Sequence, residues 1–156
     1  MNEMSNLESK EQEKTKKPYN LKARQGKAAL YRNYIRRELA DELYRKILEM
    51  LIIEKRYLNP NFSARDLTSE LQTNSRYLSA VINSRFNTNF PSLVNEYRVK
   101  EVMTLLTDPR YVDKNVVEIS KMAGFSNRQS FYSSFYRFVG TSPSAFRKQK
   151  MNEKNA

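Results

Sequence analysis

Apolar side chains recur at helical spacing along most of the chain and predict an all-α fold. Residues 41–55 carry five aliphatic side chains on one stripe, namely Leu43, Ile47, Leu48, Leu51 and Ile52. Such a stripe is typical of an amphipathic helix that covers a core. A longer helix is predicted from Phe90 to Leu106, ended by the Asp108-Pro109 pair.

Polar residues stand where several of these helices should begin. Ser63 is followed three residues later by Asp66, and Asn115 by Glu118, which is the spacing of a capping box. We expect four caps that also leave helix N-termini available to phosphate groups: Ser63, Asn74, Asn115 and Asn127. Gly124 suits a turn that requires positive φ, and Gly140 suits a helix end.

Two segments match when the sequence is shifted by 53 positions. Leu78 and Ile82 then meet Phe131 and Phe135, and Asn87 meets Gly140. Asn and Gly both tolerate the left-handed conformation that often follows a helix. The repeat predicts one helix-turn-helix unit present twice, joined by the helix from Phe90 to Leu106. A plain helical bundle with similar apolar stripes is the alternative.

The second helix of each unit presents an outward face without a carboxylate, although the chain has 17 Asp and Glu residues. A helix that enters the major groove of DNA is expected to avoid negative charge. The candidate faces, extended to the helix starts, comprise Ser75, Arg76, Ser79, Ala80 and Asn83 in the first unit and Arg128, Gln129, Ser130, Tyr132, Ser133 and Tyr136 in the second.

Charge and composition favour a nucleic-acid partner. The chain of 156 residues has a net charge of +11, and such a field attracts polyanions. Residues 1–38 are predicted to be a basic, largely disordered tail, without structure to about residue 27 and with a short helix near 28–37. The tail is interpreted either as a solubilising segment or as an arm that contacts phosphates. The compact domain is predicted over 39–150.

The missing residue types exclude several kinds of chemistry. The chain contains no Cys and no His, so disulfides, thiolate zinc sites and His-based catalysis are excluded. No glycine-rich phosphate loop and no calcium-loop spacing is present. We therefore expect no enzymatic activity, no catalytic residue, no cofactor and no metal. We also expect no membrane contact and a cytoplasmic location, because no apolar run is long enough to span a bilayer and the N-terminus lacks the apolar core of a signal peptide. A nucleoid-associated location is expected if the partner is DNA.

The chain resembles the DNA-binding domain of the AraC/XylS family over about residues 41–148. The segment VVEISKMAGFS at 116–126 is similar to the entry of that family's second helix-turn-helix unit. The segments FYSSF at 131–135 and VGTSPSAFR at 139–147 are similar to its closing signature. The chain departs from the family at Gln72 and Asn87, where glycine is usual, and at Thr68, where alanine is usual.

The resemblance implies about seven helices in two lobes and a sequence-specific transcription regulator. It implies that the helices after Asn74 and Asn127 enter adjacent major-groove segments and that base contacts come from Arg76, Ser79, Ala80, Gln129, Ser130 and Ser133. Double-stranded DNA is the expected partner, with RNA polymerase as a further one. No small-molecule effector site is recognisable, and the oligomeric state is left open.

Two other functions remain open at this stage. The chain is either an output or interaction module of a larger signalling regulator, or a protein that binds nucleic acid without sequence preference. Arg98 and Arg147 are interpreted as structural residues that pair with carboxylates inside the domain rather than as base readers. Tyr132 either contacts DNA or packs sideways against the protein.

Overall fold

The computed structural model describes residues 21–156, and all regular secondary structure in that part of the chain is helical. The α-helices are α1 (Leu21–Leu48), α2 (Ala64–Glu70), α3 (Ser75–Phe86), α4 (Phe90–Leu106), α5 (Val116–Met122), α6 (Arg128–Val139) and α7 (Pro143–Asn155). The described residues also form three short helices, η1 (Glu49–Ile53), η2 (Arg56–Leu58) and η3 (Pro109–Tyr111). The predicted all-α class with seven helices is confirmed, and α4 has the predicted bounds.

The chain divides into two units, Met1–Glu38 and Leu39–Ala156, and the second contains both helix-turn-helix units. Two predicted bounds need correction. Helix α1 begins at Leu21, so the expected lack of structure to residue 27 does not hold for its first seven residues. Helix α7 continues to Asn155, beyond the predicted domain end at residue 150. Residues 1–20, the rest of the predicted disordered tail, lie outside the described residues.

The end of α1 differs from the regular helix predicted over residues 41–55. The α-helix ends at Leu48 and continues as the five-residue π-helix η1, which is followed by Lys55 at φ 48°. The wider π turn shifts which side chains face the core. Leu51 is buried as expected, but Ile52 is 53% exposed, so its predicted place in the core is wrong.

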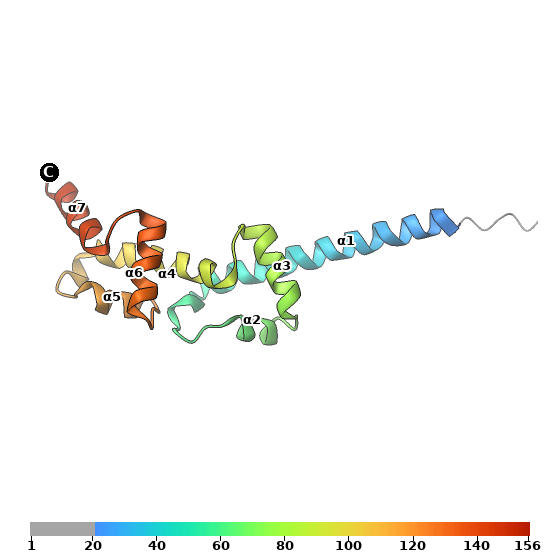
Figure 1. Cartoon of the computed structure of the whole chain (residues 1–156), viewed down its shortest axis with the longest axis horizontal. Helices are drawn as coiled ribbons and strands as arrows, with labels where there is room; N and C mark the ends of the chain where they lie inside the picture. Colours follow the sequence, from blue (N-terminus) through green and yellow to red (C-terminus); the bar gives the residue numbers. More distant parts are fainter. Residues whose placement is uncertain (1–20) are drawn as a thin grey trace, which may run out of the picture. The chain divides into compact units, whose positions relative to one another are not determined.

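Each helix-turn-helix unit has its own hydrophobic core, and α4 contributes to both. The first core includes Ile47, Leu67, Leu78 and Ile82, and it receives Leu93 and Val94 from the start of α4. The second core includes Ile119, Phe131, Phe135 and Phe146, and it receives Val99, Val102, Leu105 and Leu106 from the rest of α4. Figure 1 shows α4 between α3 and α6. Helix α4 therefore belongs to both lobes and connects them through buried side chains.

The predicted caps are confirmed at all four positions. Ser63 and Asn115 form complete capping boxes with Asp66 and Glu118. The side chain of Asn74 accepts a hydrogen bond from the backbone N–H of Tyr77 at 2.8 Å. The side chain of Asn127 accepts one from the backbone N–H of Ser130 at 2.9 Å. These caps fix where α2, α3, α5 and α6 begin.

The turns of the two units differ by one residue. The caps Ser63 and Asn115 are 52 positions apart, whereas Asn74 and Asn127 are 53 apart. Gln72 adopts φ 50° after α2, as Gly124 adopts φ 94° after α5. Asn87 and Gly140 also have positive φ, at 54° and 80°, as the repeat predicted. The first unit thus keeps the turn conformation that favours glycine while using Gln72.

Candidate nucleic-acid interface

Helix α3 exposes the whole face that the sequence predicted for DNA. Its inward side chains Leu78, Val81 and Ile82 are almost fully buried. The five candidate residues on its other side are all exposed, namely Ser75, Arg76, Ser79, Ala80 and Asn83. The helix has 12 residues and no carboxylate among them. The outward face of α3 therefore offers one guanidinium, small polar groups and one methyl group to solvent.

Helix α6 presents a similar face with a stronger aromatic content. Phe131 and Phe135 are fully buried, which anchors the inward side of the helix. Arg128, Gln129, Ser133 and Tyr136 are exposed, and Ser130 and Tyr132 are half-buried. Phe138, near the end of the helix, is 39% exposed. Helix α6 also contains no carboxylate.

Tyr132 packs sideways while keeping part of its ring accessible. Its ring centroid lies 4.9 Å from that of Phe131, and the guanidinium of Arg128 lies 5.7 Å from the Tyr132 ring. These aromatic and cation–π contacts hold both the phenol and the guanidinium in place. The position of Tyr132 is therefore set mainly by packing, whereas Tyr136, at 65% exposure, stands out from the surface.

Arg98 joins the first lobe to α4 in a way that the sequence did not predict. Its Nε donates a hydrogen bond to the backbone oxygen of Tyr57 at 2.8 Å, and its Nη2 donates to the backbone oxygen of Asn59 at 3.0 Å. The partners are carbonyl groups rather than the expected carboxylates, which corrects the predicted pairing. Burial lowers the pKa of Arg98. Arg98 still has a structural role, because it satisfies the carbonyl groups of η2 and of Asn59, which follows η2.

The second lobe contacts the backbone of η2 through Gly124. A Cβ atom at this position would lie 2.3 Å from the backbone oxygen of Tyr57 and 2.8 Å from that of Leu58. The neighbouring ring of Phe125 lies 5.8 Å from the Arg98 guanidinium. The turn between α5 and α6 therefore packs directly on the backbone of η2. We call this set, formed by Tyr57, Leu58, Arg98, Gly124 and Phe125, the interlobe contact.

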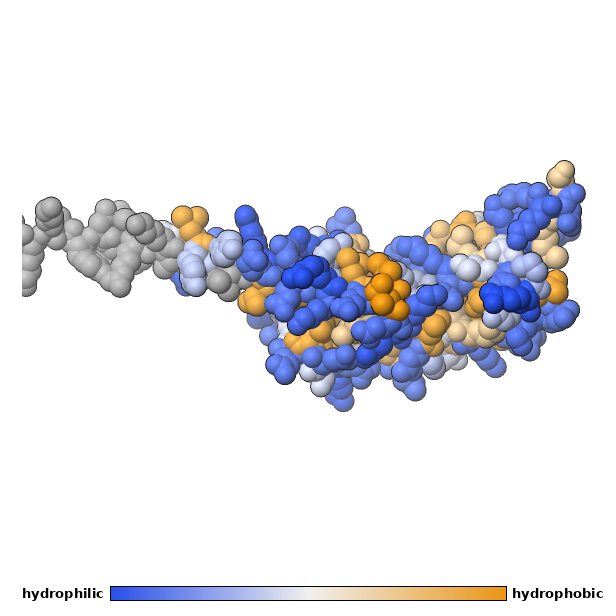
Figure 2. All heavy atoms as spheres, turned by 180° about the vertical axis from the view of Figure 1, so that it is seen from behind, coloured by the Kyte–Doolittle hydropathy of each residue, from blue (hydrophilic) through white to orange (hydrophobic). Residues whose placement is uncertain are grey.

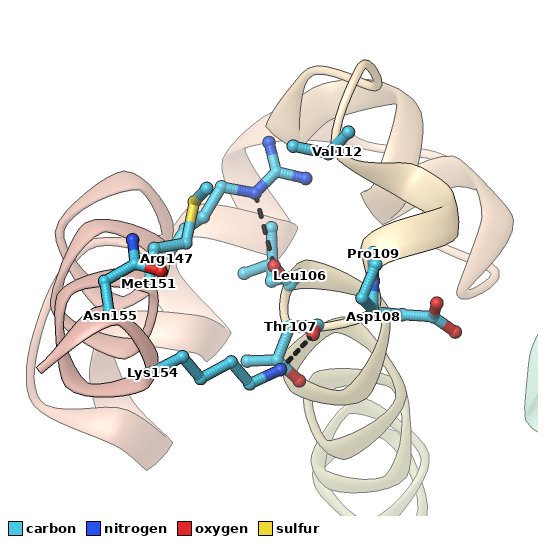
Figure 3. A pocket seen from close by; sticks show the side chains of 9 residues that line it. All are labelled: Leu106, Thr107, Asp108, Pro109, Val112, Arg147, Met151, Lys154 and Asn155. Carbon is cyan, nitrogen blue, oxygen red and sulfur yellow. Dashed lines mark hydrogen bonds between the residues drawn. The ribbon is translucent and has the colours of Figure 1, made fainter.

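Arg147, on α7 in the second lobe, also binds backbone carbonyl groups, as Arg98 does in the first. Its guanidinium donates to the backbone oxygens of Leu106, Tyr111 and Lys114 at 3.4, 3.2 and 2.8 Å. Here too the partners are carbonyl groups instead of the expected carboxylates. Figure 3 shows Arg147 and Lys154 reaching from α7 across a hollow toward the end of α4, where Lys154 Nζ donates to the oxygen of Thr107 at 2.7 Å. These bonds fasten α7 to the connecting helix.

Two other features, a metal-binding cluster and a membrane-spanning helix, are not found among the described residues. No three His, Cys, Asp or Glu side chains among residues 21–156 are grouped so that they could hold a metal ion. None of the helices in this range combines the length and apolarity needed to span a membrane. Figure 2 shows one face of the molecule as largely hydrophilic with a compact apolar patch near its middle.

Comparison with known proteins agrees with this geometry. A family model described as a helix-turn-helix domain matches residues 67–149. The melibiose operon regulatory protein of Escherichia coli strain K12 is 29% identical over 83 residues, which cover 53% of this chain and 26% of that protein. The Msm operon regulatory protein of Streptococcus mutans is 29% identical over 101 residues, which cover 65% of this chain and 35% of that protein. The chain thus spans about a quarter to a third of the length of these relatives.

A solved structure shares the arrangement of the helices. The C-terminal domain of the two-component response regulator yesN from Fusobacterium nucleatum superimposes with a TM-score of 0.53 at 25% identity. The match covers 67% of this chain and 98% of that domain. Nearly the whole of that domain is therefore matched by this chain.

Proposed function

Because the chain belongs to the AraC/XylS family of helix-turn-helix transcription regulators, we propose that α3 and α6 read adjacent major-groove segments of one DNA site. The observation that carries this proposal is the repeated pair of exposed, carboxylate-free helix faces within one compact unit. Major-groove edges present hydrogen-bond donors and acceptors that such polar and cationic side chains complement. The protein would act on chromosomal DNA in the cytoplasm.

Arg76 and Gln129 are the proposed base readers. Both are exposed and lie in the first turn of their helices, the part of a recognition helix that reaches base edges in helix-turn-helix proteins. A guanidinium matches the O6 and N7 acceptors of guanine, and a carboxamide matches N6 and N7 of adenine. Ser79, Ala80, Ser130 and Ser133 would supply water-mediated contacts or contacts with thymine methyl groups.

The caps support phosphate binding at the edges of the same surface. The side chains of Asn74 and Asn127 each accept the N–H of the third residue of their helices, so the N–H groups of the first and second residues are left to other acceptors. A phosphate is favoured at such an N-terminus. Ser63 and Asn115 cap the preceding helices in the same manner.

Selection of bound duplexes from a random DNA pool tests the proposal. The wild-type protein should enrich two short motifs, one for each recognition helix. Arg76→Ala should weaken binding by about 1–3 kcal/mol and relax the preference at one base pair of one motif. Gln129→Ala should disturb only the other motif.

Arg45→Ala is the matched control for the loss of a cation, because Arg45 is exposed on α1, outside both helix-turn-helix units. This variant should retain the motifs and their order of preference. Enrichment of no motif would indicate sequence-independent binding and would contradict the proposal. An equal loss on all sequences with Arg76→Ala would reduce Arg76 to a phosphate contact.

A further inference from the structure

A polar groove lies between the start of α4 and the exposed side of α6. Ser92 and Asn95 line it from α4, and Ser130, Ser133 and Arg137 line it from α6. Asn89, the cap of α4, also lines it. The groove thus adjoins two residues of the proposed reading face of α6. Helix α4, which forms the other side of the groove, is separated from α3 in the chain by residues 87–89 only.

Arg137 is held at this groove by two contacts from different elements. Its Nη2 donates a hydrogen bond to the hydroxyl of Ser92 on α4, and its guanidinium lies 4.6 Å from the ring centroid of Phe138. Phe138 is an exposed aromatic side chain. Its exposure has a physical use here, because a stacked guanidinium keeps its orientation and loses less freedom on binding an anion.

The chemistry of the lining favours an anion that accepts several hydrogen bonds. Hydroxyl groups, carboxamides and one guanidinium form the polar part of the groove, and no Asp or Glu is among the described residues that line it. Arg85, near the end of α3, instead pairs with Asp41 of α1. Arginine, with its planar set of donors, is well suited to bind phosphate oxygens.

The position of the groove indicates which phosphate it meets. Two adjacent major-groove segments on one side of B-DNA are separated by the minor groove, whose two edges are sugar-phosphate strands. A protein surface between two recognition helices therefore faces phosphates rather than base edges. One side of this groove is formed by residues 89–95 at the start of α4, which follows α3 closely in the chain, and the other side is formed by α6.

We propose that this groove binds a backbone phosphate of the DNA between the two segments that α3 and α6 read, with Arg137 as the principal ligand. Ser92, Asn95 and Ser133 would complete the hydrogen bonds to the phosphate oxygens. The inference rests on the proposed function. Its effect would be to fix where the duplex crosses the junction of the lobes, because phosphate contacts set position rather than sequence preference.

A salt titration of DNA affinity tests the site, using Arg137→Gln and the control Arg110→Gln. Arg110 is an exposed cation on η3, paired with Asp108, so both variants lose one positive charge. Arg137→Gln should lower affinity about tenfold and reduce the slope of log affinity against log salt by about 0.9. Arg137→Lys should retain most of the slope, because it keeps the charge. Thermal unfolding would verify that each variant is folded.

Duplexes with one neutral methylphosphonate locate the contact. On a duplex selected as above, neutralising the phosphate between the two motifs should weaken the wild type but weaken Arg137→Gln no further. Equal salt slopes for the Arg137→Gln and Arg110→Gln variants, or additive losses in the methylphosphonate experiment, would overturn the site. Failure of the proposed function would appear earlier, as the lack of any selected motif. The salt titration on random duplex would then still decide whether Arg137 binds phosphate.

Discussion

At the scale of single residues, Gly124 and Gly140 have similar backbone conformations and very different surroundings. Gly124 has φ 94° and faces the carbonyl groups of Tyr57 and Leu58 at distances that no Cβ atom tolerates. Gly140 has φ 80° and has no neighbouring atom within 4 Å of a Cβ. A substitution at Gly140 therefore tests the free energy cost of a left-handed conformation alone. A substitution at Gly124 adds the cost of a clash at the interlobe contact.

Gly124→Ala should destabilise the protein by about 2–5 kcal/mol, because it adds overpacking against backbone to left-handed strain. Gly140→Ala should cost only about 1–2 kcal/mol, since it adds strain alone. Urea unfolding of the two variants beside the wild type measures both values. Equal losses would show that the turn after α5 does not press on η2 in solution.

At the scale of elements, the short helix η3 depends on one carboxylate. Asp108 accepts a hydrogen bond from the backbone N–H of Arg110 at 3.0 Å and pairs with its guanidinium at 2.6 Å. Hydrogen bonds from the Arg110 side chain, followed by that from its backbone, lower the pKa of Asp108 from 3.8 to about 2. The folded state therefore favours the ionised form. This contribution to stability is fully present above about pH 4 and is lost as the pH falls toward 2.

Asp108→Asn should make the loss of stability between about pH 4 and pH 2 less steep, because the amide keeps a cap oxygen but cannot titrate. Asp66 still contributes an acid-dependent loss in the variant, because its pKa is also lowered by the hydrogen bonds with Ser63 in the capping box. Thermal unfolding at a series of pH values measures the difference. Asp113→Asn, which removes the same charge from an exposed position, is the control. Identical pH profiles for Asp108→Asn and the wild type would refute the role of Asp108.

Helix starts could be predicted from the sequence where they are set by residues a few positions away in the chain. Caps such as Ser63 and Asn127 act within three positions, so the starts of α2 and α6 could be found from spacing alone. The exposed faces of α3 and α6, which we propose read DNA, followed from the period of the helix. The π-helix η1 was missed because its wider turn does not follow from the apolar spacing, which also fits a regular helix.

Contacts between distant elements could not be predicted in this way. Arg98 and Arg147 were expected to be structural, but their carbonyl partners lie about 40 residues away in sequence and depend on the fold. Gly124 carried a signal for positive φ and none for its approach to Tyr57. Phe138 has the apolar character of a core residue, yet its ring is exposed and lies beside the Arg137 guanidinium.

At the scale of the whole molecule, both helix-turn-helix units lie within the compact unit Leu39–Ala156. Its two cores share α4, and the interlobe contact closes the second lobe onto the first. Both features oppose independent movement of the lobes, because separating them would expose buried side chains and carbonyl groups. We therefore expect α3 and α6 to accept one spacing of motifs on DNA, close to one helical turn of about 34 Å.

The most direct measurement is the affinity for a selected duplex and for versions with about 5 or 10 base pairs inserted between its two motifs. Both insertions should reduce binding to the level of a duplex with a single motif. The shorter insertion turns one motif to the opposite side of the helix, and the longer one moves it a full turn away. Undiminished affinity for either duplex would contradict a fixed pair of recognition helices.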